Sequence, residues 1–310
     1  MKVFVAGASG ALGRRLTPAL LEAGHGVTGM TRSQESADRL RQAGADAVVC
    51  DVFDRERLTE AVHDAAPDAV VHQLTALPSE FDIRKIDYGP TNRLRTEGTR
   101  NLLDAAAAAG VSRFVSQSIA FMYAPDGGHP ATEDEPVHTE APAPFGQAAA
   151  ATEDGDRQVV GARGMSGLVL RYGFFYGPGT YYAADGHAAG EFRKRRQPVV
   201  GPGTGVFPWI HIDDAASATV AAVERGEAGI YNVCDDEPAA MKEWVPVYAE
   251  ALGAKRPLKV PLWLGRLAAG PLAAHFATQM RGASNAKAKR ELGWQPRYAS
   301  WREGFRESLG

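Results

Sequence analysis

The sequence predicts an α/β fold of the Rossmann type, a doubly wound parallel sheet with a smaller C-terminal substrate-binding portion. Two observations favour this fold. Short β-branched runs alternate with alanine- and leucine-rich amphipathic stretches up to residue 171, as in parallel strands joined by crossover helices. A glycine-rich turn also follows the first apolar run directly. Hydrophobic residues form 45% of the 310-residue chain, enough for a sizeable core.

The predicted strands and helices alternate from the N-terminus onward. Apolar β-branched runs indicate strands, and apolar residues with a period near 3.6 indicate helices. We expect strands at Lys2–Ala6, Gly26–Thr31, Ala47–Cys50, Ala69–His72, Arg113–Gln117 and Gly167–Arg171. We expect helices at Leu12–Ala23, Gln34–Ala43, Arg55–Ala65, Thr91–Ala109 and Ala148–Gly161, and a long loop at Ala124–Gly146.

After Arg171 the alternation of strand and helix patterns becomes less regular. We therefore predict a dinucleotide-binding domain over residues 1–172 and a smaller substrate-binding portion over 173–310, with the chain able to cross between them. The interrupted apolar stretch Pro261–Met280 predicts a packed helix rather than a membrane span. Further elements are expected at Ile230–Val233 and Met241–Leu252.

Charge and cysteine usage narrow the class of protein. The net charge of −3 gives no reason to expect a nucleic-acid partner, because non-specific binding to polyanions needs concentrated positive charge. The basic run Arg193–Arg196 is interpreted as a solvated helix end. Cys50 and Cys234 lack the spacing of a zinc site, and no metal is expected. We predict a cytoplasmic protein with no membrane partner.

The glycine-rich turn predicts a dinucleotide site. Gly7 permits a tight turn after the first strand, Gly10 lets a pyrophosphate approach the backbone, and Gly13 lets the next helix pack closely. The helix N-terminus then offers unpaired N–H groups to the phosphates. The turn also contains Ser9, Ala11 and Leu12.

The end of the second strand favours NADP(H) over NAD(H). An NAD site needs a carboxylate there to hold the ribose 2′-hydroxyl, whereas this strand ends in Thr31-Arg32-Ser33. Arg32 can meet a 2′-phosphate with help from the two hydroxyls, although a solvated surface arginine is the alternative. Asp51 and Val52 are expected beside the adenine.

Several segments in order resemble the extended or atypical short-chain dehydrogenase/reductase superfamily, especially its NAD-dependent epimerase/dehydratase branch. The resemblance implies cofactor contacts at Gln73, Leu74, Thr75, Gln117, Tyr172 and Gly173, and a possible homodimer. The segments are GASGALG at 7–13, VVHQLTA at 70–76, EGTRNLL at 97–103, RFVSQS at 113–118, LRYGFFYGPG at 170–179, WIHIDDAASA at 209–218, GIYNVCDDEP at 229–238 and KRELGWQPRY at 289–298.

The residues that handle protons in that family are replaced here. Its tyrosine and lysine, four residues apart, align with Phe145 and Ala149, and its serine or threonine aligns with Ile119. Phenylalanine cannot donate a proton, so the family's acid/base pair cannot operate at these positions. Candidate replacements are Ser118, Tyr123, Tyr176 and His187.

The substrate is expected to be a small, fairly hydrophobic molecule. The Asn and Arg that sugar-nucleotide members use correspond to Phe174 and Phe207, which argues against a nucleotide sugar. The candidate substrate contacts are aromatic, and ordinary core packing is the alternative for each. They are Phe145, Phe174, Tyr181, Tyr182, Phe207 and Trp209.

Three functions remain open at this point. The first is an NADP(H)-dependent oxidoreductase acting on a carbonyl, alcohol, imine or activated alkene. The second is a redox-neutral isomerase, cyclase or dehydratase, and the third is a non-catalytic NADP-binding regulator. Asp213 and Asp214 are assigned only a helix-capping role.

Overall fold

The computed structural model describes residues 1–78, 80, 83 and 85–309. Seven parallel strands form the central sheet in the order β11-β6-β5-β4-β1-β2-β3. This confirms the predicted fold class. The strands are β1 (Lys2–Ala6), β2 (Gly26–Thr31), β3 (Asp46–Val49), β4 (Ala69–His72), β5 (Arg113–Ile119), β6 (Ser166–Tyr172) and β11 (Gly229–Val233).

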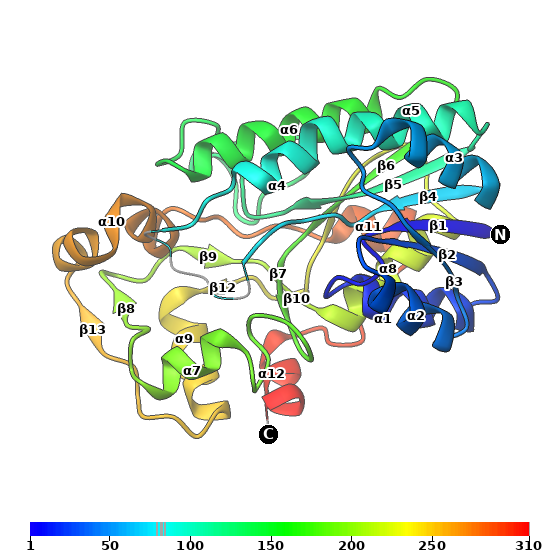
Figure 1. The fold of residues 1–310 in the computed structure, drawn as a ribbon. Coiled ribbons are helices and arrows are strands. Elements are labelled where there is room, and N and C mark those ends of the chain that lie inside the picture. The colour runs from blue at the N-terminus through cyan, green and yellow to red at the C-terminus, as the bar shows by residue number, and fades with distance from the viewer. Residues whose placement is uncertain (79, 81–82, 84, 310) are drawn as a thin grey trace.

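Helices cover both faces of the sheet (Figure 1). The helices on each face pack apolar side chains onto β-branched residues of the strands, as amphipathic segments between parallel strands should. One face carries α1 (Gly13–Glu22), α2 (Gln34–Gln42) and α8 (Ile212–Glu224). The other carries α3 (Arg55–Ala65), α5 (Thr99–Ala108) and α6 (Phe145–Val160), with α4 (Gly89–Arg93) and a π-helical turn at Leu94–Gly98 leading into α5.

Most of the C-terminal elements lie beside the sheet (Figure 1), and most of these share a separate apolar cluster. Trp209 and Trp244 lie at its centre, with ring centroids 4.9 Å apart. The helices that contribute to it are α7 (His187–Arg193), α9 (Met241–Ala251), α10 (Leu262–Thr278) and α12 (Trp301–Leu309), whereas α11 (Ala286–Glu291) packs on β11 of the central sheet. The short strands are β7 (Phe174–Tyr176), β8 (Val199–Val200), β9 (Val206–Phe207), β10 (Trp209–His211), β12 (Ala239–Ala240) and β13 (Lys259–Val260).

The structure corrects three sequence predictions. The helix predicted at Thr91–Ala109 is divided by the π-helical turn, and α10 is broken at Gly270, where φ is +83°. Asp213 and Asp214 do not cap α8, because the Asp213 N–H donates to Nδ1 of His211. The Asp214 carboxylate instead accepts the backbone N–H groups of Arg297 and Tyr298.

The short strands β7 to β9, β12 and β13 and the helices α11 and α12 were not predicted, because segments this short carry little periodicity. Only the end of α7 was predicted, at the basic run that begins with Arg193. Across the described ranges, no helix is long and apolar enough to cross a membrane.

Candidate functional site

The loops after β1 and β4 meet at the carboxyl edge of the sheet. These two strands are neighbours, and the chain continues outward from them in opposite directions, which is where open α/β sheets bind ligands. Gly7 has φ +93°, and a Cβ there would lie 2.8 Å from the backbone carbonyl carbon and oxygen of Gln73. Only glycine fits between the two loops.

The turn from Gly7 into α1 has the shape that a phosphate pair requires. A Cβ on Gly13 would lie 2.3 Å from the Gly7 carbonyl oxygen, so α1 approaches the turn as closely as its backbone permits. The first turn of α1 contains no acidic residue, which leaves the positive end of the helix available to an anion. These are the features that a pyrophosphate group fits.

Arg14 is a candidate phosphate contact that the sequence analysis missed. It is exposed at the start of α1, and its Nη2 lies 3.5 Å from the place where a Cβ of Gly179 would stand. The guanidinium therefore reaches from the glycine-rich turn to the loop after β7. The available signal was a basic first helical turn, where acidic residues are usual.

The candidate contacts for a ribose 2′-phosphate lie at the end of β2 and include the exposed Arg32. Thr31 Oγ1 and Ser9 Oγ are 3.1 Å apart, which joins the β2 end to the glycine-rich turn. Ser33 caps α2 by accepting the Ser36 N–H, so its hydroxyl proton is left to donate. In the described part of the chain, no carboxylate pairs with Arg32.

The predicted adenine region follows β3. The Asp51 carboxylate accepts the Phe53 N–H, and the carbonyl of Val52 accepts from the Asn101 side chain at 3.0 Å. The guanidinium of Arg93 lies 3.7 Å from the centre of the Phe53 ring. This edge therefore offers a flat cationic and aromatic surface.

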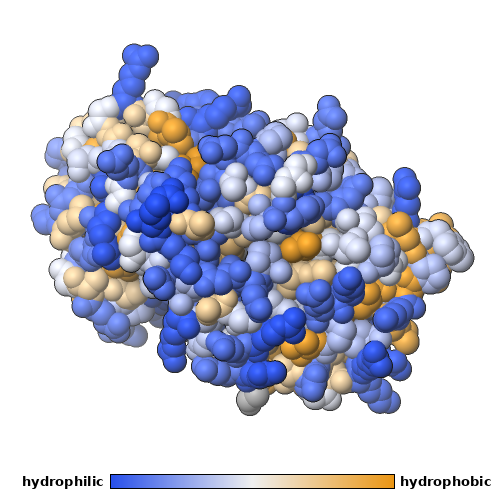
Figure 2. Space-filling model, turned by 180° about the vertical axis from the view of Figure 1, so that it is seen from behind, coloured by the Kyte–Doolittle hydropathy of each residue, from blue (hydrophilic) through white to orange (hydrophobic). Residues whose placement is uncertain are grey.

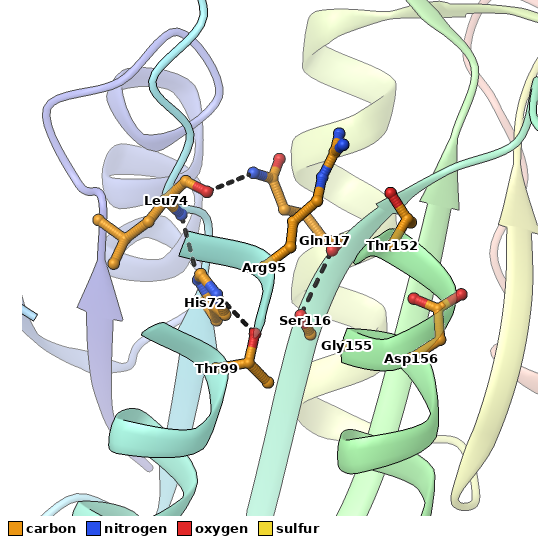
Figure 3. Close-up of a pocket in the computed structure, with 9 residues that line it drawn as sticks. All are labelled: His72, Leu74, Arg95, Thr99, Ser116, Gln117, Thr152, Gly155 and Asp156. Carbon is orange, nitrogen blue, oxygen red and sulfur yellow. Dashed lines mark hydrogen bonds between the residues drawn. The ribbon is translucent and has the colours of Figure 1, made fainter. Parts of the chain in front are cut away.

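A small polar cavity lies between β4, β5, α5 and α6 (Figure 3). Its upper rim is fixed by Gln117, whose Nε2 donates to the Leu74 carbonyl at 3.1 Å. His72 Nδ1 accepts the Leu74 N–H, and burial lowers the pKa of His72 to about 4, so this imidazole is neutral. The lining residues are His72, Leu74, Arg95, Thr99, Ser116, Gln117, Thr152, Gly155 and Asp156.

Arg95 brings an unpaired cation to this cavity. Its Nη1 is buried and has no hydrogen-bond partner among the described residues, and burial lowers the pKa of Arg95 to about 10. Its side chain points toward the same end of the cavity as the Gln117 amide and the Leu74 carbonyl (Figure 3). Burial also raises the pKa of Tyr88 to about 12, and the charge of Arg95 opposes that rise. The sequence analysis identified neither residue.

Aromatic side chains surround Phe145, which the sequence analysis aligned with the tyrosine of the family's proton-handling pair. Phe145 is the first residue of α6 and is buried, with its ring centroid 6.3 Å from that of Phe121. Phe121 stacks on Phe174 at 3.9 Å, and Phe276 meets Phe145 edge-on at 5.2 Å. Ala149 is fully buried one turn into α6. We call Phe121, Phe145, Phe174 and Phe276 the phenylalanine wall.

Two histidines that the sequence analysis missed lie beside the phenylalanine wall. The ring centroids of His138 and His275 are 5.1 Å apart, and that of His275 is 6.1 Å from that of Phe145. Burial lowers the pKa of both histidines and so favours their neutral form. Phe145 is therefore bordered by aromatic rings and by histidines whose neutral form is favoured.

The structure does not bring the four predicted catalytic residues together. The Tyr123 hydroxyl donates to Asn232 at 2.6 Å and accepts from Arg171 at 3.0 Å, and Tyr176 donates to the Asp235 carboxylate at 3.0 Å. Ser118 is buried close to Asp156. His187 begins α7, rather than lying in a loop, and stacks on Tyr181 at 5.6 Å.

The remaining predicted substrate and cofactor contacts differ in how deeply they are buried. Phe207 and Trp209 are buried in the C-terminal aromatic cluster, whereas Phe174, Tyr181 and Tyr182 keep part of their surface exposed. The Tyr172 hydroxyl bonds to Thr219 at 2.7 Å, and Gln73 Nε2 donates to it at 3.4 Å.

We expect Asp156→Ala to lower the free energy of unfolding by about 3 to 5 kcal/mol, because it leaves the buried Arg171 without a counter-charge. Arg171 Nε donates to the Asp156 carboxylate at 3.0 Å, and both side chains are about 5% exposed or less. Urea unfolding measures the change. Glu35→Ala, which removes an exposed partner of Arg39, is the control and should have little effect. Equal effects of the two substitutions would contradict the prediction.

Comparison with known proteins agrees with this geometry. Residues 3–234 match the model of the NAD dependent epimerase/dehydratase family. A Streptomyces sp. 3-diazoavenalumate denitrifying reductase is 44% identical over 98% of this chain and 99% of its own length. UDP-glucose 4-epimerases from Thermotoga maritima and Thermus thermophilus share the fold, with TM-scores of 0.77 and 0.74 and identities of 22% and 24%. They cover all of this chain and 97% and 98% of their own, and the Thermus structure holds NAD.

Proposed function

This chain belongs to the NAD-dependent epimerase/dehydratase family, and we propose that it is a nicotinamide-dependent reductase of small aromatic molecules that carry a diazo group. The observation that carries the proposal is the phenylalanine wall, which contains Phe145, the residue that the sequence analysis aligned with the family's proton donor. The reductase that is 44% identical over nearly the full chain supports the same reaction class.

Reduction of an arenediazonium group needs no proton donor at the reacting carbon. A C–H bond forms, the C–N bond breaks, N₂ leaves with the bonding pair, and a reduced nicotinamide supplies the hydride and is oxidised. Reduction of a ketone, in contrast, must protonate the developing alkoxide. Phe145 and Ala149 cannot do this, so the replaced pair favours the diazo substrate over the carbonyl predicted from the sequence.

The phenylalanine wall also suits the charge of such a substrate. The faces of phenyl rings attract cations, and a diazonium group is cationic. A lysine at position 149 would repel it, whereas the buried Ala149 and the neutral His138 and His275 do not. Two residues of the phenylalanine wall, Phe121 and Phe145, belong to the predicted dinucleotide-binding domain.

We assign the cofactor to the carboxyl edge, with NADP(H) preferred. Gly7, Gly10 and Gly13 would hold the pyrophosphate, with Arg14 closing over it, and Arg32 would meet the ribose 2′-phosphate. Arg95 would donate its unpaired Nη1 to the nicotinamide half of the cofactor, between Leu74 and Gln117. This assignment gives Tyr123 and Tyr176 no contact with the cofactor, because their hydroxyls bond to side chains inside the protein.

Deuterium tracing tests the reaction. NADPH labelled on the transferable C4 position, incubated with the protein and 3-diazoavenalumate, should place deuterium on the ring carbon that loses N₂. One N₂ should appear for each cofactor oxidised. The matched control is unlabelled NADPH in D₂O, which should leave that ring carbon unlabelled.

The same experiment separates the other two functions. A redox-neutral isomerase or dehydratase would form product without net cofactor oxidation, and a regulator would bind NADPH without turnover. Ring deuterium that comes from the solvent, or NADPH that stays reduced, would overturn the proposed reductase. Each rate is compared with that of a protein-free reaction, which measures any direct reaction of NADPH with the diazo compound.

A further inference from the structure

Positive charge is concentrated in one segment near the C-terminus. Residues 251–290 contain eight Lys and Arg and no Asp or Glu. The rest of the chain then has 26 basic and 37 acidic residues, a net charge of −11, whereas the whole chain is at −3. Three of the eight cations, Arg281, Lys289 and Arg290, pair with carboxylates of the chain, so the charge available to an anionic partner comes from the others.

Exposed apolar side chains are concentrated in the same segment. Of nine exposed large hydrophobic residues in the described part of the chain, five lie between residues 258 and 267. Trp263 is 68% and Leu267 is 78% exposed, and because they are four residues apart they lie on one side of α10. We call this group the α10 surface: Leu258, Leu262, Trp263, Leu264 and Leu267.

The fold presents the α10 surface outward. Gly270 breaks α10, and the half after the break buries Leu272 and Phe276. The half before the break is buried at Gly265 alone, where a Cβ would lie 2.3 Å from Val200 Cγ1. This half therefore rests on β8 through a glycine backbone. Leu262 lies over Gly201, whereas Trp263 and Leu267 are largely exposed.

Cations border the α10 surface. Arg195 Nη2 donates to the Arg256 carbonyl at 3.1 Å, which places the basic run 193–196 beside it. At the end of the molecule that carries α10, on the right in Figure 2, hydrophobic atoms lie among hydrophilic ones. Four further cations on the segment are exposed, and none has a carboxylate partner within the described ranges; they are Lys255, Arg256, Lys259 and Arg266.

We propose that the α10 surface docks the protein on an anionic lipid bilayer. Trp and Leu side chains enter the headgroup boundary, and Lys and Arg beside them meet the negative lipid headgroups. A symmetric contact between two copies would set the same four cations against each other, which opposes self-association through this surface. This proposal departs from the sequence analysis, which predicts no membrane partner because the interrupted stretch Pro261–Met280 cannot span a bilayer. Docking on the surface of a bilayer requires no span.

Vesicle flotation with the full chain tests the proposal. Vesicles of equal phosphatidylglycerol and phosphatidylcholine should bind the protein at least tenfold more tightly than pure phosphatidylcholine vesicles, and 0.5 M salt should release it. The double variant Trp263→Ser/Leu267→Ser should lose the binding. Both side chains are largely exposed, so the variant should keep its circular dichroism spectrum and melting temperature.

Two control variants test whether vesicle binding depends on the α10 surface in particular. Val160→Ser removes another exposed apolar side chain, 42% exposed, and should leave vesicle binding unchanged. Trp263→Leu should retain binding but lose the blue shift in tryptophan emission that vesicles produce. Absence of flotation at low salt, or binding that the double variant retains, would overturn the proposal. A particle of doubled mass that the double variant makes monomeric would also overturn it, in favour of a second copy.

Discussion

Gly13→Val should weaken binding of both nicotinamide dinucleotides by at least about 100-fold, roughly 2.7 kcal/mol. A Cβ at this position would lie 2.3 Å from the Gly7 carbonyl oxygen and 2.6 Å from the Ala8 carbonyl group. Neither contact can be relieved by a flexible side chain, because both partners are backbone. The start of α1 must therefore move away from the turn, and the N–H groups offered to the phosphates move with it.

Titration calorimetry with NADPH and NADH measures the effect. Gly190→Ala is the matched control, because Gly190 lies inside α7 and a Cβ there would meet nothing within 4 Å. We expect that variant to bind both cofactors like the natural chain. If Gly13→Val melts at a much lower temperature, the milder Gly13→Ala is titrated at low temperature. Unchanged affinity in a folded Gly13→Val protein would contradict the proposed site.

Local patterns in the sequence were sufficient to predict the sheet and the glycine-rich turn. β1, β2, β4 and α3 have the predicted bounds, and β3, β5, β6 and α1 differ from theirs by one or two residues. Alternating apolar runs and a glycine at a positive φ depend on neighbours along the chain, which a single sequence displays. The contact of Gly7 with Gln73 was not predicted; it arises because β1 and β4 are neighbours in the sheet.

The contents of the site depend on contacts between distant segments, and these are not visible in the sequence. Phe121 faces Phe145 across the long loop, and His275 reaches the same place from α10. Arg95 approaches α6 so closely that a Cβ on Gly155 would lie 2.6 Å from its carbonyl oxygen. Ser118, Tyr123 and Tyr176 were chosen by strand position, which fixes where a backbone ends but not which partner a hydroxyl finds. His187 was chosen because imidazole titrates near neutral pH.

Arg32→Ala should raise the dissociation constant for NADPH by about 10- to 150-fold and change that for NADH by less than about threefold. A charge-assisted hydrogen bond to a phosphate is worth about 1.5 to 3 kcal/mol, and only NADPH carries the 2′-phosphate. Arg32 is exposed, so the preference for NADPH should also shrink as salt rises. Arg32→Asp should go further and favour NADH, because a carboxylate there can accept the ribose hydroxyl.

The control for this prediction is an exposed arginine at the opposite edge of the sheet. Arg163 lies just before β6, at the amino edge, and Arg163→Ala should leave both dissociation constants unchanged. A natural chain that binds NADH more tightly than NADPH would contradict the role of Arg32. So would an Arg32→Ala variant that loses both cofactors equally, because a general loss of affinity would mean that Arg32 supports the shape of the turn rather than reading the phosphate.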